Sequence, residues 1–252
     1  MILHILDGGA IEIRDWSAFD PAAPPGRPRL LSDPCFLIVH ENGVLLWDAG
    51  LPDSARNRPN GMPVGEHAVF HVKRALREEL ADLGFAPDDV DLVGLSHLHR
   101  DHVGNLALFS SATLLVQDDE LSVATGPRAN AMGYDPQACI AAVAMKKVQL
   151  LGDHDVFGDG SVVVLRLPGH TIGSQALLVR LPETGPVLLS GDLAHSRANW
   201  RSRAVPALNL DAERTVTSLE AADRLAASEG AQIWVQHDRA QMEALSRMAP
   251  FC

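Results

Sequence analysis

Four side chains able to bind a metal ion lie within six positions of the chain: His97, His99, Asp101 and His102. They directly follow the apolar run 90–95, which predicts a buried strand. If the strand continues through His99, His97 and His99 point to one face, because strand side chains alternate with a period of two. A turn can then bring Asp101 and His102 round to a second position, and Gly104 permits the chain to bend. Since a catalytic zinc ion commonly takes three protein ligands, four donors in one loop indicate a pair of metal ions.

Three further donors each come shortly after an apolar run later in the chain: His170, Asp192 and His237. The runs are 165–167, 187–190 and 233–236, and each is predicted to be a strand that delivers one side chain into a loop. A sheet presents functional groups on a rigid base in this way. Imidazole nitrogen and carboxylate oxygen suit zinc, but they also suit iron, manganese and cobalt, so the donor types leave the metal open.

The elements expected to position these donors are mostly strands. Strands are predicted at 2–6, 36–40, 44–47, 90–95, 113–116, 148–151, 161–167, 176–181, 187–190 and 232–236. Helices are predicted at 66–83, at 211–228 and close to the C-terminal end, and Asn42-Gly43 favours a hairpin turn. The Pro-rich stretch 16–34 is predicted to be a long irregular loop. This mixture indicates sheets covered by helices, in a single domain that spans residues 1–252.

Composition and charge exclude several classes of function. A net charge of -11 leaves no broad cationic surface for nucleic acid or anionic lipid, so neither is expected as a partner. No apolar run approaches the roughly 20 residues that span a bilayer, and the first residues have no signal-peptide pattern. We therefore expect a soluble, cytoplasmic protein. Cys35, Cys139 and Cys252 are far apart and outside any CxxC pattern, which indicates two core thiols and one at a loose terminus.

The donor pattern resembles that of the metallo-β-lactamase superfamily, in which an HxHxDH motif is followed by separate His, Asp and His ligands. The resemblance runs from the Asp48-Ala49-Gly50 turn to His237 and implies an α/β fold, an αββα four-layer sandwich. It also implies a ligand set, with His97, His99 and His170 on one metal ion, Asp101, His102 and His237 on the other, and Asp192 bridging both. Asp48 matches a supporting position, and we expect it to orient a ligand imidazole.

Within the superfamily the chain is most similar to the N-acyl homoserine lactone lactonases, through the early DxG turn and the segment LPGHTIGSQ. The resemblance implies a metal-dependent hydrolase that opens lactone rings, foremost N-acyl homoserine lactones, with two divalent metal ions, for which zinc is expected. A hydroxide on the ions would attack the ester carbonyl, and Asp192 would carry the proton. His195 stands where these lactonases often have a tyrosine, three residues after the bridging aspartate. We expect His195 to hydrogen-bond the oxyanion or the substrate amide.

The sequence leaves other functions open as alternatives. The GDLxH form is also similar to the methyl parathion hydrolase-like branch, so a broad-specificity aryl esterase or phosphotriesterase is the main alternative. Glyoxalase-type thioester hydrolysis is disfavoured because no basic cluster lies near the C-terminal end. A diiron redox protein would need a flavin module, for which little length is left, and the full donor set disfavours a non-catalytic metal-binding module.

The sequence marks the substrate pocket only weakly. Five side chains either line an acyl or aryl pocket or serve ordinary packing or a dimer contact: Trp16, Phe19, Met132, Tyr134 and Met145. No motif marks the acyl-chain preference, the native metal or the oligomeric state, and a homodimer stays open.

Overall fold

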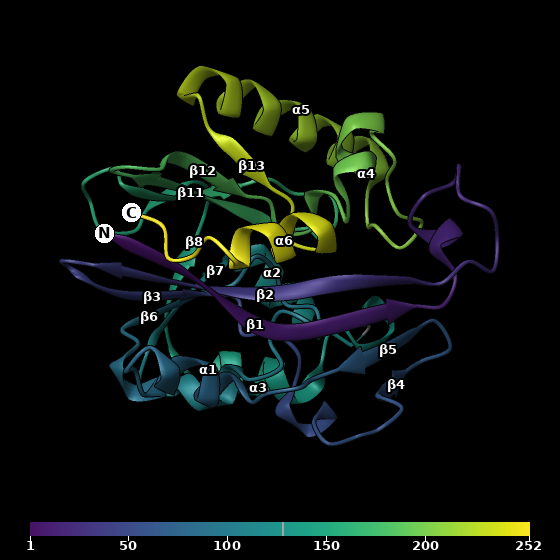
Figure 1. The fold of residues 1–252 in the computed structure, drawn as a ribbon, viewed down its shortest axis with the longest axis horizontal. Helices are drawn as coiled ribbons and strands as arrows, with labels where there is room; N and C mark the ends of the chain where they lie inside the picture. Colours follow the sequence, from purple (N-terminus) through teal and green to yellow (C-terminus); the bar gives the residue numbers. More distant parts are fainter. Residues whose placement is uncertain (128) are drawn as a thin grey trace.

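Two β-sheets lie face to face in the middle of the molecule, and helices cover their outer faces (Figure 1). The computed structural model describes residues 1–127 and 129–252. The larger sheet has the strand order β4 (Met62–Val64), β5 (Ala68–His71), β1 (Ile2–Ile13), β2 (Arg29–His40), β3 (Gly43–Trp47), β6 (Leu92–Gly94), β7 (Thr113–Gln117) and β8 (Lys146–Leu150). The smaller sheet has the order β13 (Gln232–Trp234), β12 (Gly185–Leu189), β11 (Gln175–Leu181), β10 (Val162–Arg166) and β9 (His154–Asp155).

The helices fall into two groups and one separate element. Three pack outside the larger sheet: α1 (Leu76–Asp82), α2 (Asp118–Ala124) and α3 (Pro136–Ala144). Two lie outside the smaller sheet: α4 (Arg197–Ser202) and α5 (Ala212–Glu229). The separate helix α6 (Arg239–Ser246) lies beside β1 and β2 at the margin between the sheets (Figure 1). Short 3-10 turns occur at Trp16–Ala18, Asp53–Ala55, Pro87–Asp89, Leu106–Phe109, Asn130–Met132 and Gly191–Leu193.

Alternating strand side chains divide the core into layers. On β2, Phe36 and Ile38 pack between the sheets, whereas Leu37 packs on the side of helices α1, α2 and α3. On β11, Leu177 packs between the sheets and Leu178 packs against the helices of the opposite side. A period of two puts successive side chains on opposite faces, so strands that are apolar throughout bury both faces. The predicted αββα four-layer arrangement is confirmed.

Two predictions about the first part of the chain are wrong. The stretch predicted to be a loop up to Pro34 ends earlier, because β2 begins at Arg29 and pairs with β1 as far as Ile13. This ladder contains a register shift between Asp7 and Ala10, beside the Asp7–Pro34 pair. A proline has no N–H for a regular ladder, but a strand tolerates it at such an irregularity.

The range 66–83 is also not a single helix. Its first part forms β5, and α1 begins only at Leu76. Pairing of Phe70 with Ile11 on the neighbouring strand β1 outweighs the apolar spacing of three and four in this range. The strand predicted at 2–6 continues to Ile13, and the other predicted elements, including the helix at 211–228 and the terminal helix, are confirmed with ends displaced by a few residues. Helices α2, α3 and α4 and the short strands β4 and β9 have no counterpart among the predicted elements.

Five strands end at the same edge of the paired sheets. Strands β3 and β6 are parallel neighbours, and so are β12 and β13. Strand β10 runs in the direction of β12, because both are antiparallel to β11. The loops that follow these five strands therefore meet. One backbone hydrogen bond joins the two sheets there, from Gln175 N to Ser96 O at 2.9 Å.

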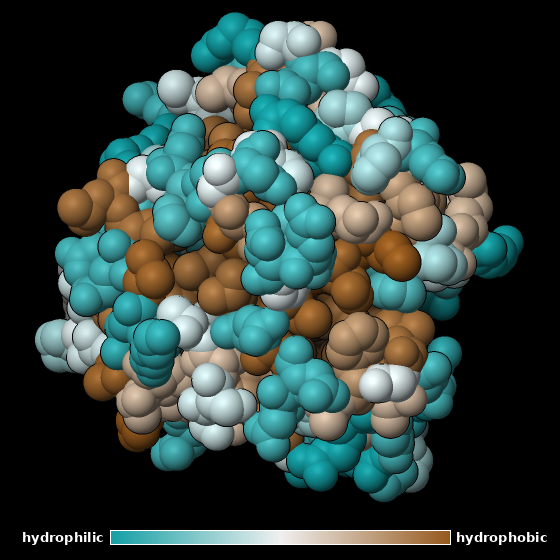
Figure 2. Space-filling model, turned by 90° about the vertical axis from the view of Figure 1, so that its left-hand side faces the viewer, coloured by the Kyte–Doolittle hydropathy of each residue, from teal (hydrophilic) through white to brown (hydrophobic). Residues whose placement is uncertain are grey.

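The opposite side of the molecule carries both chain ends. Leu3 and Phe251 exchange backbone hydrogen bonds of 2.8 and 2.9 Å, and the Cys252 carbonyl accepts one of 2.9 Å from Glu183 N. The terminus expected to be loose is thus held, while Cys35 and Cys139 are buried as expected. Figure 2 looks onto this side and shows apolar residues gathered near its centre between polar margins. Within residues 1–127 and 129–252, no helix has both the length and the apolar character needed to cross a bilayer.

Candidate metal centre

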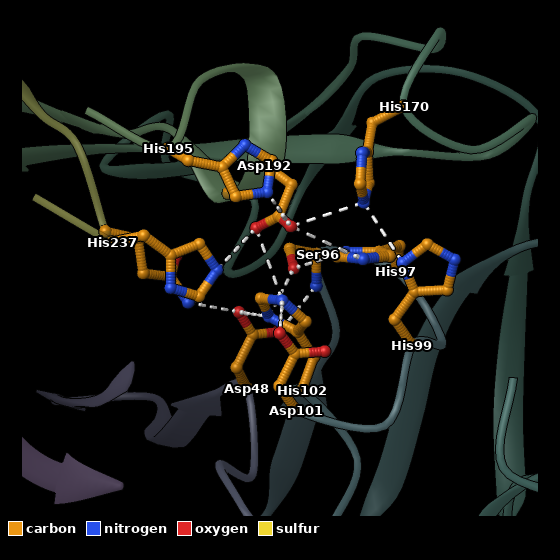
Figure 3. Close-up of polar contacts among 12 residues, drawn as sticks. Asp48, Ser96, His97, His99, Asp101, His102, His170, Asp192, His195 and His237 are labelled. Atoms are coloured by element: carbon orange, nitrogen blue, oxygen red, sulfur yellow. Dashed lines mark hydrogen bonds and ion pairs between the residues drawn. The ribbon is translucent and has the colours of Figure 1, made fainter. Parts of the chain in front are cut away.

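The seven predicted donors and His195 meet in one cluster at the shared edge of the two sheets (Figure 3). Within it, several groups of nitrogen and oxygen atoms lie within 4.8 Å of one another and could hold a metal ion. The groups are His97, His99 and His170; Asp33, Asp101, His102 and His237; His97, His102 and Asp192; and His170, Asp192 and His195. Every site residue chosen from the sequence is therefore brought into the cluster, and one residue that was not chosen, Asp33, joins it.

Asp192 lies between two sets of imidazoles. Its Oδ1 is 2.9 Å from His237 Nε2 and 3.3 Å from His102 Nε2. Its Oδ2 is 3.2 Å from His170 Nε2 and 3.9 Å from His97 Nε2. Each carboxylate oxygen thus faces a different set of rings, and Oδ2 also faces His195, as Figure 3 shows. A carboxylate placed in this way can serve two cations at once.

Four of the imidazoles use Nδ1 to contact the surrounding protein. The contacts are His97 to Ser96 Oγ at 3.1 Å, His102 to Asp48 Oδ2 at 2.9 Å, His170 to Asn209 Oδ1 at 2.9 Å and His237 to the Ser32 carbonyl oxygen at 2.7 Å. A carboxylate, an amide oxygen or a carbonyl oxygen accepts a hydrogen bond, so these partners assign a ring proton to Nδ1 of His102, His170 and His237, whereas the Ser96 hydroxyl can donate to His97 Nδ1 or accept from it. In the neutral form of these rings the Nε2 lone pair points into the cluster, which is the arrangement found in imidazoles that bind metals.

The residues present fit divalent cations. Nε2 of His97 and Nε2 of His102 are buried and have no hydrogen-bond partner among the residues that the structure describes. A buried polar atom without a partner costs about 1–3 kcal/mol, and a cation beside it would remove that cost. His99 Nδ1 and His170 Nε2 lie 3.0 Å apart and face the same point. Imidazole and carboxylate donors of this kind bind zinc and the neighbouring first-row metals.

Asp48 connects the first histidine loop to the end of the smaller sheet. Its backbone has a φ of 60°, in the left-handed region, where aspartate is tolerated better than most residues. Its Oδ1 accepts from Ser96 N at 2.7 Å, and its Oδ2 accepts from His102 Nδ1 and from Gln236 Nε2 at 2.7 Å. The prediction that Asp48 orients an imidazole of the site is confirmed by the contact with His102.

Glu120 ties two donor loops together from helix α2. Its Oε1 accepts from Leu98 N at 3.0 Å, between His97 and His99. Its Oε2 accepts from Gly173 N at 2.9 Å, in the loop that carries His170. The side chain is completely buried, and burial raises the pKa of its carboxyl group, which these hydrogen bonds partly offset. Glu120 therefore fixes the separation of the two loops.

His195 is held between a carboxylate and two rings. Its Nε2 is 3.2 Å from Asp192 Oδ2, and its Nδ1 has no hydrogen-bond partner among the described residues. Its ring stacks on His237, with centroids 5.4 Å apart and planes inclined by 11°. The Phe19 ring contacts it edge-on at 4.8 Å. These contacts restrict the ring to one orientation, with Nδ1 left for another partner.

The protonation of the cluster differs between its two halves. Burial lowers the pKa of His170 to about 3 and lowers that of His97 well below its ordinary value, so both rings are neutral. Burial also disfavours charge on His237, but the Asp192 carboxylate outweighs it and raises the pKa of His237 to about 9. Burial opposes ionisation of Asp192 too, yet His237 and His102 hold its pKa well below the ordinary value. The Asp192 anion is thus stable at neutral pH.

Several supporting residues were not found from the sequence: Ser32, Asp33, Ser96, Asn105, Glu120 and Asn209. Asn105 donates to the carbonyl oxygens of Ala49 and Leu51 at 3.0 and 2.7 Å and so fastens the Asp48 turn to the histidine loop. All six are common residue types. Only the positions of Ser96, directly before His97, and of Asn105, three residues after His102, could have indicated a role.

The apolar pocket candidates belong mostly to the core. Tyr134 and Met145 are buried in the cluster beneath helices α2 and α3, and Met132 packs against it. Trp16 and Phe19 are buried beside β1 and β5, and among these five candidates Phe19 contacts the ring of His195. Met132 and Met145 therefore belong to the core, whereas Phe19 and Tyr134 border the cluster, since the Tyr134 ring centroid lies 5.2 Å from that of His99.

A family model described as the metallo-beta-lactamase superfamily matches residues 29–237. Among curated proteins, the chain is similar to the N-acyl homoserine lactonase AttM of Azorhizobium caulinodans, with 34% identity over 215 residues and 81% of each chain covered. It is also similar to the N-acyl homoserine lactonase AiiA of Bacillus thuringiensis subsp. kurstaki, with 29% identity over 230 residues, covering 89% of this chain and 88% of the relative.

The fold is similar to that of a solved N-acyl homoserine lactone hydrolase that has the product N-hexanoyl-L-homoserine bound at its catalytic metal centre. The TM-score is 0.86 at 27% identity, and the match covers 96% of this chain and 95% of that one. A structure of AbOPH, described as a hydrolase in the beta-lactamase superfamily, matches with a TM-score of 0.62 at 22% identity over 84% and 74% of the two chains. That second likeness concerns the fold alone.

Proposed function

The chain belongs to the metallo-beta-lactamase superfamily, and from this membership we propose that it opens the ring of N-acyl homoserine lactones with two divalent metal ions, most simply zinc. The observation that carries the proposal is the position of Asp192 between two sets of imidazoles whose Nε2 atoms face inward. Lactonases at 34% and 29% identity, and a hydrolase of the same fold with a ring-opened product at its metal centre, support this substrate class.

We assign the metal ligands from the grouping of the donors. His97, His99 and His170 would hold one ion, and Asp101, His102 and His237 would hold the other, with Asp192 contributing an oxygen to each. Bound divalent ions supply Lewis acidity, which polarises an ester carbonyl and makes water a stronger acid. The histidines and Asp48 have the task of keeping that pair of positions rigid.

The remaining chemistry falls to Asp192 and His195. Ring opening requires that a proton pass from the attacking water to the ring oxygen that leaves. Asp192 is buried and anionic, and we assign it the transfer of that proton. His195 would hydrogen-bond the substrate, at the oxyanion or the amide of the acyl chain, because its Nδ1 has no partner among the described residues and its ring is held in place.

A substrate panel tests the reaction. N-acyl homoserine lactones of several chain lengths would be compared with an aryl ester and with paraoxon, using protein of measured metal content and an EDTA-treated sample. We expect the highest kcat/KM for a lactone and loss of turnover after chelation. Higher kcat/KM for the aryl ester or for paraoxon would replace the lactonase proposal by an esterase or phosphotriesterase that uses the same donors.

Three variants test the role of His195. His195→Ala should lower kcat/KM for lactones about tenfold or more, since positioned hydrogen-bonding groups contribute at least this much. His195→Tyr, which restores the residue often found in lactonases of this group, should recover part of the loss. His154→Ala on strand β9 serves as the control histidine and should leave kcat/KM unchanged. Equal kcat/KM for His195→Ala and the control would show that His195 does not touch the substrate.

A further inference from the structure

Asp33 is a buried carboxylate with no visible partner. The residue is only 1% exposed, and neither Oδ1 nor Oδ2 has a hydrogen-bond partner among the described residues. No nitrogen of a lysine, arginine or histidine in that part of the chain lies within 4.0 Å of it, since it takes part in none of the ion pairs. Buried carboxylates are normally paired, hydrogen-bonded or bound to a metal, because an isolated buried charge is very costly.

An irregularity in the larger sheet directs Asp33 towards the cluster. Asp33 lies in β2 next to Pro34, opposite the register shift of β1 between Asp7 and Ala10. The backbones are very close there, because a Cβ atom on Gly8 would lie 2.3 Å from the Asp33 carbonyl oxygen. Bulges of this kind re-aim a side chain and are frequent next to active sites. The preceding residue, Ser32, accepts the hydrogen bond from His237 Nδ1, so this short segment reaches the site twice.

The atoms that Asp33 faces are metal donors. One of its carboxylate oxygens lies within 4.8 Å of donor atoms on Asp101, His102 and His237, and these four atoms also lie within 4.8 Å of one another. Donors about 2.0–2.2 Å from a common zinc ion are themselves up to roughly 4.4 Å apart. Asp33 makes no direct hydrogen bond to these described donors, and their grouping within 4.8 Å is close to the spacing of donors that share a cation. Within this group of four residues, His102 Nε2 is also buried without a hydrogen-bond partner among the described residues.

No lysine or arginine among the described residues supplies a cation in its place. On the far side, Asp33 borders a groove of about 800 Å³ between β1, β2 and α6, whose lining includes Lys73, Arg239 and Arg247. None of these three side chains forms an ion pair with Asp33: Arg239 pairs with Glu243 at 2.6 Å instead. The Asp33 carboxylate is therefore available to bind a cation inside the cluster.

We infer that Asp33 is a further metal ligand, which binds the cation held by Asp101, His102 and His237. The inference rests on the proposed metal pair and adds to it a donor outside the HxHxDH pattern. The two metal positions are then unequal. One would have three imidazoles and the shared Asp192 carboxylate, whereas the other would have two imidazoles and three carboxylates, Asp192 included. Such an oxygen-rich set binds harder divalent ions better than the imidazole-rich set does.

Metal titration of the full-length protein and of Asp33→Asn tests the inference. Metal-free protein would be titrated with Zn²⁺ against a chromophoric chelator, and with Co²⁺ while the visible absorption is recorded. We expect two ions per wild-type chain. In Asp33→Asn one ion should bind with unchanged affinity, and the affinity for the other should fall about tenfold or more, as in sites that lose a supporting group. The cobalt spectrum should change for that ion alone.

The stability of the metal-free protein gives a second readout. Removing a buried carboxyl group that has no partner among the described residues should raise the Tm of the EDTA-treated protein in Asp33→Asn and in Asp33→Leu, although both variants should bind metal less well. An opposite effect on stability and on metal affinity is not expected for a residue that merely packs. Asp7→Asn is the matched control, since Asp7 is exposed, lines the same groove and lies across the ladder from Pro34.

The outcomes separate this inference from the proposed function. Two ions bound with unchanged affinity and an unchanged cobalt spectrum in both Asp33 variants would overturn the inference and leave the two-metal proposal standing. Wild-type protein that binds no divalent ion would overturn both.

Discussion

Replacing Glu120 should show that the separation of two donor loops is set from helix α2. In Glu120→Ala, the backbone N–H groups of Leu98 and Gly173 lose their acceptors, at 3.0 and 2.9 Å, inside a buried region. Each buried N–H left without a partner costs about 1–3 kcal/mol, so the free energy of unfolding should fall by about 2–6 kcal/mol. At about 2–4 °C per kcal/mol for a chain of this size, Tm should fall by roughly 4–24 °C.

Glu120→Gln should destabilise the protein less than Glu120→Ala does. Glutamine keeps one acceptor oxygen but turns an NH2 group towards the other N–H, so the loss should be about 1–3 kcal/mol. Glu220→Gln on α5 is the control, because the Glu220 side chain is 55% exposed and lies 4.0 Å from its only ion-pair partner among the described residues, Arg224. Its stability should change by no more than about 0.5 kcal/mol.

The assay is urea unfolding of metal-free protein, so that metal loss does not enter the result, followed by metal titration of each variant. Because Leu98 lies between His97 and His99, we also expect Glu120→Ala to weaken metal binding at that position. An unfolding midpoint for Glu120→Ala equal to that of the Glu220→Gln control would refute the reasoning, since the two N–H groups would then have found other partners.

Four further predictions concern the donor loops and their protons. A Cβ atom on Gly104 would lie 2.2 Å from Pro52 N, so Gly104→Ala should lose about 1–3 kcal/mol in urea unfolding; an unchanged midpoint would mean that the loop can shift freely. The pKa of His237 is raised to about 9, above its unfolded value of about 6.5, so its contribution to the stability of metal-free protein is complete below about pH 6.5 and is lost as the pH rises through 9. The same proton must leave before a metal binds, so Zn²⁺ affinity measured by chelator competition should rise by up to about tenfold per pH unit until pH 9, and a plateau from pH 7 upwards would contradict this. Asp48→Asn should lower the affinity for one of the two metal ions about 10–100-fold in metal titration, because the carboxylate that orients His102 is lost. The fold should be retained, as judged by circular dichroism.

The donor set could be predicted because its residue types are uncommon and its spacing is local. His97 and His99 are two residues apart on an extended segment, and their common face follows from the period of a strand. His170, Asp192 and His237 each follow an apolar run, and the runs that precede them are strands in the structure. The layers of the sandwich follow from the same alternation, since β2 and β11 are apolar on both faces. Resemblance to a known family added the pairing of donors to the two metal ions, which spacing alone left open.

Contacts between distant segments decided what the sequence left undetermined. Residues 68–71 became a strand because β1 was available to pair with them, although their apolar spacing also suited a helix. Asp33 and Ser32 reach the cluster from more than 200 residues before His237, and Glu120 bonds the Gly173 backbone from another layer. A serine, an aspartate or a glutamate at such positions is ordinary in sequence. Each becomes part of the site only when the two sheets pack and their strand ends meet. The role of a buried polar group depends on its burial and on the partners within reach, and the residue type alone does not reveal either.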